Sequence, residues 1–286
     1  MPGICEIKYK PGPDVMRVHL CSDRNSGKRP CKQKRKKKQN LTSEVQAKLN
    51  ELNSFYRLSD IINANFTTTD YSVGLDYRDG EMPMSFDEGM RDVQNFIRRV
   101  QRLCRKRNLL KPKYVYVTEM SDNWRIHHHV VISCGLSEAD LRKMWKYGRC
   151  NPDMLQPDEN GYSALAHYFE KKPVKKEKNK TIRRWNSSKG LIHPKPTYNH
   201  NRISKKRAVR INKSGGFVKD KAIDPAEIAY IESLYQGYRL VSVRQSPIND
   251  SPFGGLFVTL FFCRADSPVY KYPPRRKKSK ETEYTS

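Results

Sequence analysis

The stretch 113-KYVYVTEMSDNWRIHHHVVIS-133 decides the fold. Its two ends, residues 113–120 and 125–133, are rich in β-branched and aromatic residues, a composition that is typical of strands. A short polar segment separates them, as in a tight reversal of the chain. We therefore expect these two segments to pair as an antiparallel β-hairpin.

Three consecutive histidines stand in the second strand of this hairpin. Successive side chains of a strand alternate between its faces, so His127 and His129 point one way and His128 the other. With a turn at 120–124, Glu119 falls roughly opposite the start of the histidine strand and can share their face. Two imidazoles and a carboxylate suit a divalent first-row ion such as Mn²⁺, with Mg²⁺ and Zn²⁺ as alternatives. The alternative for the histidines is a structural role without a metal.

Hydrophobic periodicity and capping residues predict the surrounding elements. We expect helices at 43–57, 86–107 and 162–172 and after Ser137 and Asp224, strands at 69–77, 238–244 and 256–263, and a loop at 150–161. Helices and antiparallel strands around one core make the fold class α+β, with a central antiparallel sheet.

The charge is distributed very unevenly. The 286 residues include 56 Lys and Arg against 30 Asp and Glu, a formal net charge of +26. The excess lies in residues 1–40, 171–221 and 271–286, which carry net charges of +9, +16 and +4. A field this strong and of one sign points to a polyanionic partner, and solubility of the two ends is the alternative. We expect residues 1–40 to be a disordered basic arm and 271–286 a basic tail.

Several classes of protein are excluded by what the sequence lacks. No apolar run approaches the length of a membrane span, and the N-terminus has no apolar stretch of the signal-peptide type. The seven cysteines show no zinc-finger spacing, and no nucleotide-binding P-loop motif is present. We therefore expect a cytoplasmic protein with reduced thiols, no membrane association and no nucleotide cofactor.

A second candidate for chemistry is Tyr168, in the segment 162-YSALAHYFEKK-172. In a helix, Ala164, Leu165, Tyr168 and Phe169 would share an apolar face that docks on the sheet. Tyr168 could then reach the face that carries the two histidines. A core tyrosine is the alternative.

Taken in order, these motifs resemble those of a known family. They span about residues 60–195 and comprise YSVGLDY, FIRRVQRL, YVYVTEM, HHHVVI, the WKYG of Trp145–Gly148, ALAHYFEKK and RRWNSSKGLIHP at 183–194. A histidine pair in a strand followed by a tyrosine and lysine in a helix resembles the HUH endonuclease superfamily. The set is most similar to rolling-circle replication initiators of plasmids and phages, the group related to the filamentous-phage gene II protein.

The resemblance implies a role for each matching residue. These are Tyr168 as nucleophile, His127 and His129 as metal ligands, Glu119 as third ligand, and Lys171 or Lys172 beside the tyrosine. His128 departs from the family pattern, which prefers a bulky hydrophobic residue there. Tyr162 lies six residues before Tyr168, which is a poor helical spacing for a second nucleophile, so a single-tyrosine enzyme is expected.

The resemblance also implies an activity and a domain plan. The protein would nick single-stranded origin DNA with Mn²⁺ or Mg²⁺, in the cytoplasm of a bacterial host, aided by a host helicase and polymerase. The HUH fold, a ferredoxin-like or palm-like antiparallel sheet with helices, would occupy residues 41–270. That domain would include a basic DNA-binding segment at 171–221 and C-terminal strands at 238–263.

Three other functions fit the same residues. A relaxase or a single-strand transposase would use the same nicking chemistry in a different biological process. A non-catalytic DNA-binding protein would use only the basic segments. A metal-dependent hydrolase would use water in place of the tyrosine and would leave no protein attached to the DNA.

Overall fold

A computed structural model of the chain describes residues 4–22, 44–121, 125–169, 185–220, 222–245 and 257–268. Within these ranges the strands are β1 (Ile4–Tyr9), β2 (Val15–Ser22), β3 (Tyr71–Asp76), β4 (Lys113–Met120), β5 (Ile126–Ser133), β6 (Cys150–Met154), β7 (Asn186–Ser187), β8 (Thr197–Asn199), β9 (Gly216–Phe217), β10 (Tyr238–Gln245) and β11 (Phe257–Arg264). The helices are α1 (Glu44–Asn65), α2 (Phe86–Lys106), α3 (Glu138–Met144), α4 (Ser163–Phe169), α5 (Lys205–Lys213) and α6 (Pro225–Leu234), with a 3₁₀ turn at Val218–Asp220. None of the described helices combines the length and apolar character needed to cross a bilayer.

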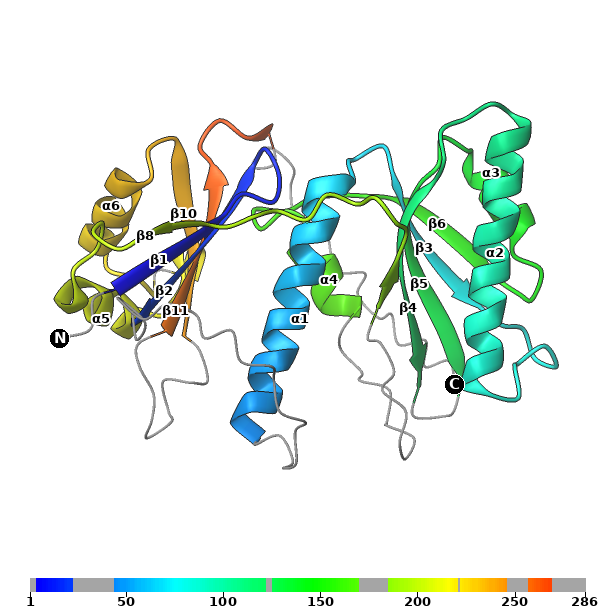
Figure 1. Cartoon of the computed structure of the whole chain (residues 1–286), viewed down its shortest axis with the longest axis horizontal. Coiled ribbons are helices and arrows are strands. Elements are labelled where there is room, and N and C mark those ends of the chain that lie inside the picture. The colour runs from blue at the N-terminus through cyan, green and yellow to red at the C-terminus, as the bar shows by residue number, and fades with distance from the viewer. Residues whose placement is uncertain are drawn as a thin grey trace, which may run out of the picture.

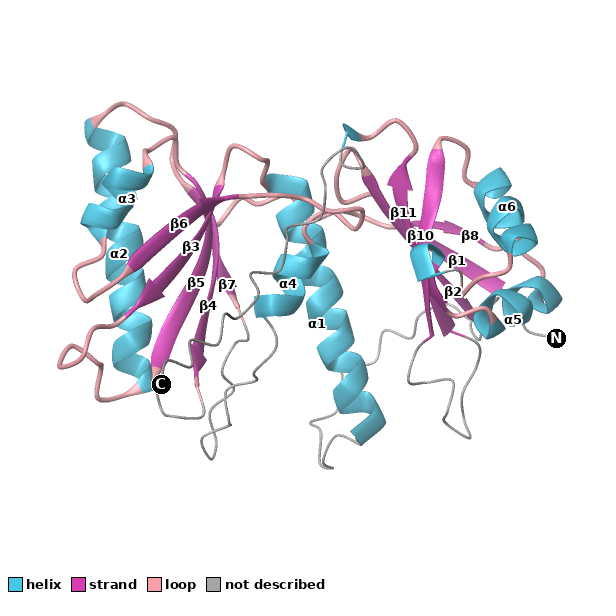
Figure 2. Cartoon of the chain, turned by 180° about the vertical axis from the view of Figure 1, so that it is seen from behind, coloured by secondary structure: helices cyan, strands magenta, loops and turns pink. Residues whose placement is uncertain are grey.

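The strands form two antiparallel sheets, one on each side of α1 (Figure 1). The five-stranded sheet has the order β6-β3-β5-β4-β7, and the six-stranded sheet has the order β8-β1-β2-β11-β10-β9. Viewed from behind, α2 and α3 cover the outer face of the first sheet, and α5 and α6 cover the outer face of the second (Figure 2). The predicted α+β class is confirmed, and the histidine strand lies inside the five-stranded sheet.

Helix α2 forms where the periodicity predicts it. The side-chain oxygen of Ser85 accepts a hydrogen bond from the backbone N–H of Glu88, which caps the first turn of the helix. The apolar stripe of α2, which includes Val93, Phe96 and Val100, is fully buried against the five-stranded sheet. Burying this stripe fixes which face of the sheet points toward α2, and so also which face points toward α1.

Residues 4–22 correct the expectation of a disordered arm at 1–40. They form β1 and β2, which pair with each other and place β2 next to β11 in the six-stranded sheet. In β2, Met16, Val18 and Leu20 alternate with Arg17 and His19, a period of two that is typical of a strand. The alternation is easily missed because both polar residues are buried as well.

Two other regions differ from expectation, whereas the C-terminal strands form where they are predicted and the structure defines the sheet that they join. Residues 150–161 were expected to be a loop, yet 150–154 form β6, an edge strand that pairs only with β3 in the described chain and therefore tolerates Pro152. The basic segment 171–221 contributes β7, β8, α5 and β9, while its residues up to 184, and 221, lie outside the described residues. The C-terminal strands β10 and β11 pair with each other and join the sheet of β1 and β2, not the histidine sheet.

Candidate metal centre

The β4–β5 hairpin brings the three predicted ligands together. Its register pairs Glu119 directly with His127, and His129 lies two positions further along β5 on the same face. Glu119 Oε2 is 3.2 Å from His127 Nε2 and 3.7 Å from His129 Nε2. The two imidazole rings stand edge to face, with centroids 5.1 Å apart. The predicted convergence of these side chains is therefore present in the fold.

The electrostatics of the cluster favour a cation between the carboxylate and the imidazoles. Burial raises the pKa of the Glu119 carboxyl, but the hydrogen bonds and positive charges of His127 and His129 outweigh burial and lower it to about 2. The hydrogen bond with Glu119 in turn raises the pKa of His127. A carboxylate held in its anionic form beside two imidazoles attracts either protons or a metal ion.

The donor set fits a divalent metal ion. One ligand atom from each of Glu119, His127 and His129 lies within 4.8 Å of the other two. Glu119 Oε1 is buried and has no hydrogen-bond partner in the described part of the chain, although burying such an oxygen without a partner is costly. A bound cation would satisfy this oxygen. Nitrogen and carboxylate ligands together suit Mn²⁺ and its first-row neighbours, and Mg²⁺ more weakly.

His128 points to the opposite face and is structural. It is fully buried between the sheet and α2, where Tyr77 Oη lies 2.9 Å from Nε2 and Thr118 Oγ1 lies 2.9 Å from Nδ1. Burial, together with the charges of the neighbouring histidines, lowers the pKa of His128 to about 3, so the ring is neutral. Its two partners explain how a polar residue replaces the hydrophobic one at this position.

Helix α4 packs directly on the metal-binding face. The ring of Phe169, which is 1% exposed, stacks on the ring of His129 at a centroid distance of 5.4 Å and an angle of 24°. Ala166, one turn earlier, is fully buried, whereas Ala164 is exposed. Of the expected apolar face, Leu165 and Phe169 pack into the core, whereas Ala164 is exposed and Ala166 is buried in its place.

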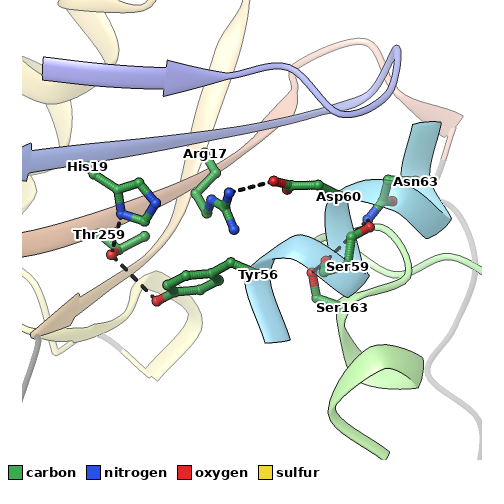
Figure 3. A network of polar contacts seen from close by, with 8 residues as sticks. All are labelled: Arg17, His19, Tyr56, Ser59, Asp60, Asn63, Ser163 and Thr259. Carbon is green, nitrogen blue, oxygen red and sulfur yellow. Dashed lines mark hydrogen bonds and ion pairs between the residues drawn. The ribbon is translucent and has the colours of Figure 1, made fainter. Parts of the chain in front are cut away.

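Helix α1 holds the start of α4 through a network of polar contacts (Figure 3). Asn63 Oδ1 accepts a hydrogen bond of 3.0 Å from the backbone N–H of Tyr162, and Ser59 Oγ lies 2.8 Å from Ser163 Oγ. Gly161 adopts φ +64°, and a Cβ there would overlap Asn63 Oδ1, so glycine is required. These contacts fix where α4 begins relative to the sheet.

The remaining predicted site residues are only partly described. Position 168 belongs to α4, but the Tyr168 side chain lies outside what the structure describes, as do Lys171 and Lys172. Tyr162 is buried, and burial raises the pKa of its hydroxyl to about 12, which suits a core residue. This supports the expectation that Tyr162 is not a second nucleophile.

Sequence reasoning missed the residues that support the cluster and α4. The sequence places Phe169 on a general apolar face, and nothing in its local pattern indicates a partner forty residues earlier. Asn63 and Ser59 lie four residues apart, the spacing of neighbours on one helix face, but their partners in α4 could not be inferred from α1 alone. Gly161 was the available signal, because an isolated glycine before a helix marks a special backbone conformation.

Comparison with known proteins supports the resemblance. No curated protein and no solved structure matches the chain significantly. The family model described as Replication-associated protein ORF2/G2P matches residues 70–173, a segment that runs from β3 past the end of α4. The matched segment contains the cluster and position 168. Over residues 70–173 this chain is therefore similar in sequence to the ORF2/G2P family of replication-associated proteins.

Proposed function

We propose that the protein initiates rolling-circle replication by nicking one strand of its origin DNA, with Tyr168 as the nucleophile. One observation carries the proposal. Glu119, His127 and His129 converge on the face of the sheet where α4 packs, with Phe169 of α4 stacked on His129. The residue next to Phe169 in the chain is Tyr168. A metal-type cluster and a tyrosine-bearing helix are thus neighbours within a replication-associated family segment.

The proposed reaction is a transesterification that conserves the number of phosphate ester bonds. The Tyr168 oxygen bonds to the scissile phosphorus as the bond from phosphorus to the 3′ oxygen breaks. The phenolic proton is lost to solvent or a base, and the leaving 3′ oxygen gains a proton. The products are a 5′-phosphotyrosine and a free 3′-hydroxyl, so the bond energy is kept for later rejoining without a nucleotide cofactor.

The other side chains of the site would each have a separate role in the reaction. A divalent ion held by Glu119, His127 and His129 would supply positive charge that stabilises the phosphate as it reacts. Lys171 or Lys172 would favour the phenolate form of Tyr168. Phe169 keeps the ring plane of His129 fixed by stacking, which preserves the direction of its Nε2 atom.

Single-stranded DNA would be held by cations and stacking residues on the side of the sheets that faces α1. Of the aromatic candidates, Tyr198 is 63% exposed and available, whereas Trp185 packs against the core and donates a hydrogen bond to Ser54. Trp124 lies outside the described residues. A host polymerase would extend the 3′-hydroxyl, and a host helicase would separate the strands in the bacterial cytoplasm.

The test compares two tyrosine variants on single-stranded DNA from beside the gene, with Mn²⁺ present. Tyr168→Phe is expected to bind this DNA as the wild type does and to cleave none of it. Tyr162→Phe removes a hydroxyl from the same helix region and is expected to keep cleaving. Cleavage by Tyr168→Phe would mean that water, and not Tyr168, is the nucleophile. Binding without cleavage by the wild type would favour a non-catalytic DNA-binding protein.

A further inference from the structure

A cavity of about 470 Å³ lies between the six-stranded sheet and α1. We name it the α1 pocket. Its sheet wall is formed by Tyr9, Arg17 and His19, and its helix wall includes Asn53 and Tyr56. The volume falls in the usual range for small-molecule sites, about 300–1,000 Å³. The α1 pocket is separate from the metal cluster, which lies on the other side of α1 against the five-stranded sheet.

Arg17 gives the pocket a buried, pre-positioned guanidinium. The residue is 5% exposed, and its guanidinium lies 4.7 Å from the ring centroid of Tyr9 and 4.3 Å from that of Tyr56. Its Nη2 binds Asp60 Oδ2 at 2.6 Å (Figure 3). Arg17 Nε is also buried, yet it has no hydrogen-bond partner among the described residues. A buried donor without a partner can bind an acceptor that a ligand supplies.

The aromatic wall is neutral and is held by hydrogen bonds. His19 Nδ1 lies 2.9 Å from Thr259 Oγ1, which also accepts a hydrogen bond from the Tyr56 hydroxyl. Burial and the charge of Arg17 lower the pKa of His19 to about 3, so its ring is uncharged. The ring contacts those of Tyr9 and Tyr56 at centroid distances of 5.7 and 5.2 Å. This wall therefore offers ring surface of low charge.

The rim of the pocket is polar and cationic. Asn53, Arg57 and His193 line it and are exposed, and Pro194 and Pro196 add apolar ring surface from the segment that crosses between the sheets. Asp60 is the acidic group of the lining, and its carboxylate is already paired with Arg17. No ion pair of Arg57 occurs in the part of the chain that the structure describes. The rim thus places the unpaired positive charge of Arg57 beside the amide of Asn53.

These features match the chemistry of a nucleotide. Unpaired bases stack on aromatic surfaces, an amide side chain can pair with a base edge, and arginine binds phosphate. We propose that the α1 pocket binds one unpaired nucleotide of the DNA strand that the protein nicks, an inference that rests on the proposed function. A helix about 10–12 Å across separates the pocket from the metal cluster, so the bound nucleotide lies some way along the strand from the scissile phosphate. The pocket would then contribute to the choice of origin sequence.

The test is an abasic scan of a fluorescent single-stranded oligonucleotide that the wild type nicks. Affinity is measured by anisotropy with chelator present, so that cleavage does not interfere. For the wild type, we expect one position away from the nick where loss of the base weakens binding about tenfold, the typical size of a stacking contribution. In the double variant Asn53→Ala, Arg57→Gln, removing the base at that position should no longer weaken binding. Abasic sites at the other positions should weaken binding as much as they do for the wild type. Both residues are exposed, so the fold should be preserved.

Arg102→Gln provides the matched control, because it removes an exposed arginine from α2 on the far face of the other sheet. It should leave the abasic profile unchanged. The same profile in the double variant and the wild type would overturn the pocket proposal while leaving nicking intact. Tight binding of a free deoxynucleoside monophosphate that competes with the oligonucleotide would overturn it in favour of a metabolite site. Failure of the wild type to bind or nick DNA would overturn the proposed function as well.

Discussion

The two sheets on either side of α1 use buried polar residues in different ways. In the five-stranded sheet, Glu119, His127 and His129 lie on the face toward α1 and gather into one cluster that fits a metal ion. In the six-stranded sheet, the corresponding face carries Arg17 and His19, which contact α1 and line the α1 pocket. In the first sheet, the carboxylate of Glu119 is available to a cation. In the second sheet, the guanidinium of Arg17 can donate a hydrogen bond to an acceptor.

The sheets also differ in how far apart their strands lie in the sequence. The five-stranded sheet is built from residues 71–187. The six-stranded sheet joins 4–22 to 238–264 and to short strands between them. A site made within one hairpin can therefore be recognised from local spacing, whereas a site made by distant strands cannot.

Loss of a metal ligand should abolish the chemistry of the five-stranded sheet. For Glu119→Ala, His127→Ala and His129→Ala we expect cleavage to fall by more than about 100-fold, because even residues that only support a ligand contribute about 10- to 100-fold. Calorimetric titration with Mn²⁺ should show weakened binding in each variant. His200→Ala removes an exposed histidine near the other sheet and should change neither property. A ligand variant that cleaves at the wild-type rate would contradict the metal assignment.

Breaking the ion pair of the six-stranded sheet should instead affect stability. Asp60→Ala leaves the buried charge of Arg17 without its partner, which should lower the free energy of unfolding by about 3–5 kcal/mol. Asp79→Ala breaks an exposed pair with Arg125 beside the histidine sheet, and such pairs contribute about 0–1 kcal/mol. Urea unfolding of the two variants measures the difference. Equal destabilisation by both would mean that the Arg17–Asp60 pair does not tie α1 to the sheet.

His19 should make stability depend on pH in a defined direction. Its pKa in the fold is about 3, below its ordinary value of 6.5, so between these values the unfolded chain binds the proton and the folded chain does not. The contribution of His19 to the free energy of unfolding is complete above pH 6.5. It falls as the pH drops toward 3, by at most about 1.4 kcal/mol per pH unit. His19→Gln should remove this part of the slope in urea unfolding between pH 4 and 6.5.

The effect of His19 must be obtained as the difference between the two proteins at each pH. Burial raises the pKa of Asp60 to about 6 against the opposing effect of Arg17, so Asp60 contributes a slope of the opposite sign below pH 6. Asp60 is present in both proteins. Identical pH profiles for the wild type and His19→Gln would contradict a neutral, buried His19.

The smallest expected effect concerns which surface meets the DNA. Replacing Lys189, Lys195 and Arg244 by Gln removes three exposed cations from segments beside α1. If each contacts one phosphate of a single strand, the slope of log binding constant against log salt concentration should become shallower by about 2. The matched triple Lys205→Gln, Lys206→Gln, Lys213→Gln lies in α5, on the outer face of the six-stranded sheet, and should leave the slope unchanged. The opposite result would place the DNA on that outer face.

Much of the five-stranded sheet could be predicted from the sequence. The hairpin register of Glu119 and His127 follows from the length of the turn and the alternation of side chains, and α2 follows from its cap and apolar stripe. The six-stranded sheet could not be predicted in the same way. Buried Arg17 and His19 hide the alternation of β2, because their burial depends on Asp60 and Thr259, which are distant in sequence. The burial of Ala166 in place of Ala164 could not be predicted because contacts with α1 fix where α4 begins.

The most direct test of the central claim is to find which atom of the protein becomes joined to the DNA. The wild type would be incubated with labelled single-stranded DNA from beside the gene and Mn²⁺, and the adduct would be separated on a denaturing gel and mapped by mass spectrometry. We predict a 5′-phosphate linked to Tyr168, formed with Mn²⁺ and lost with chelator or in His127→Ala. Cleavage without any adduct, or an adduct on another residue, would contradict it.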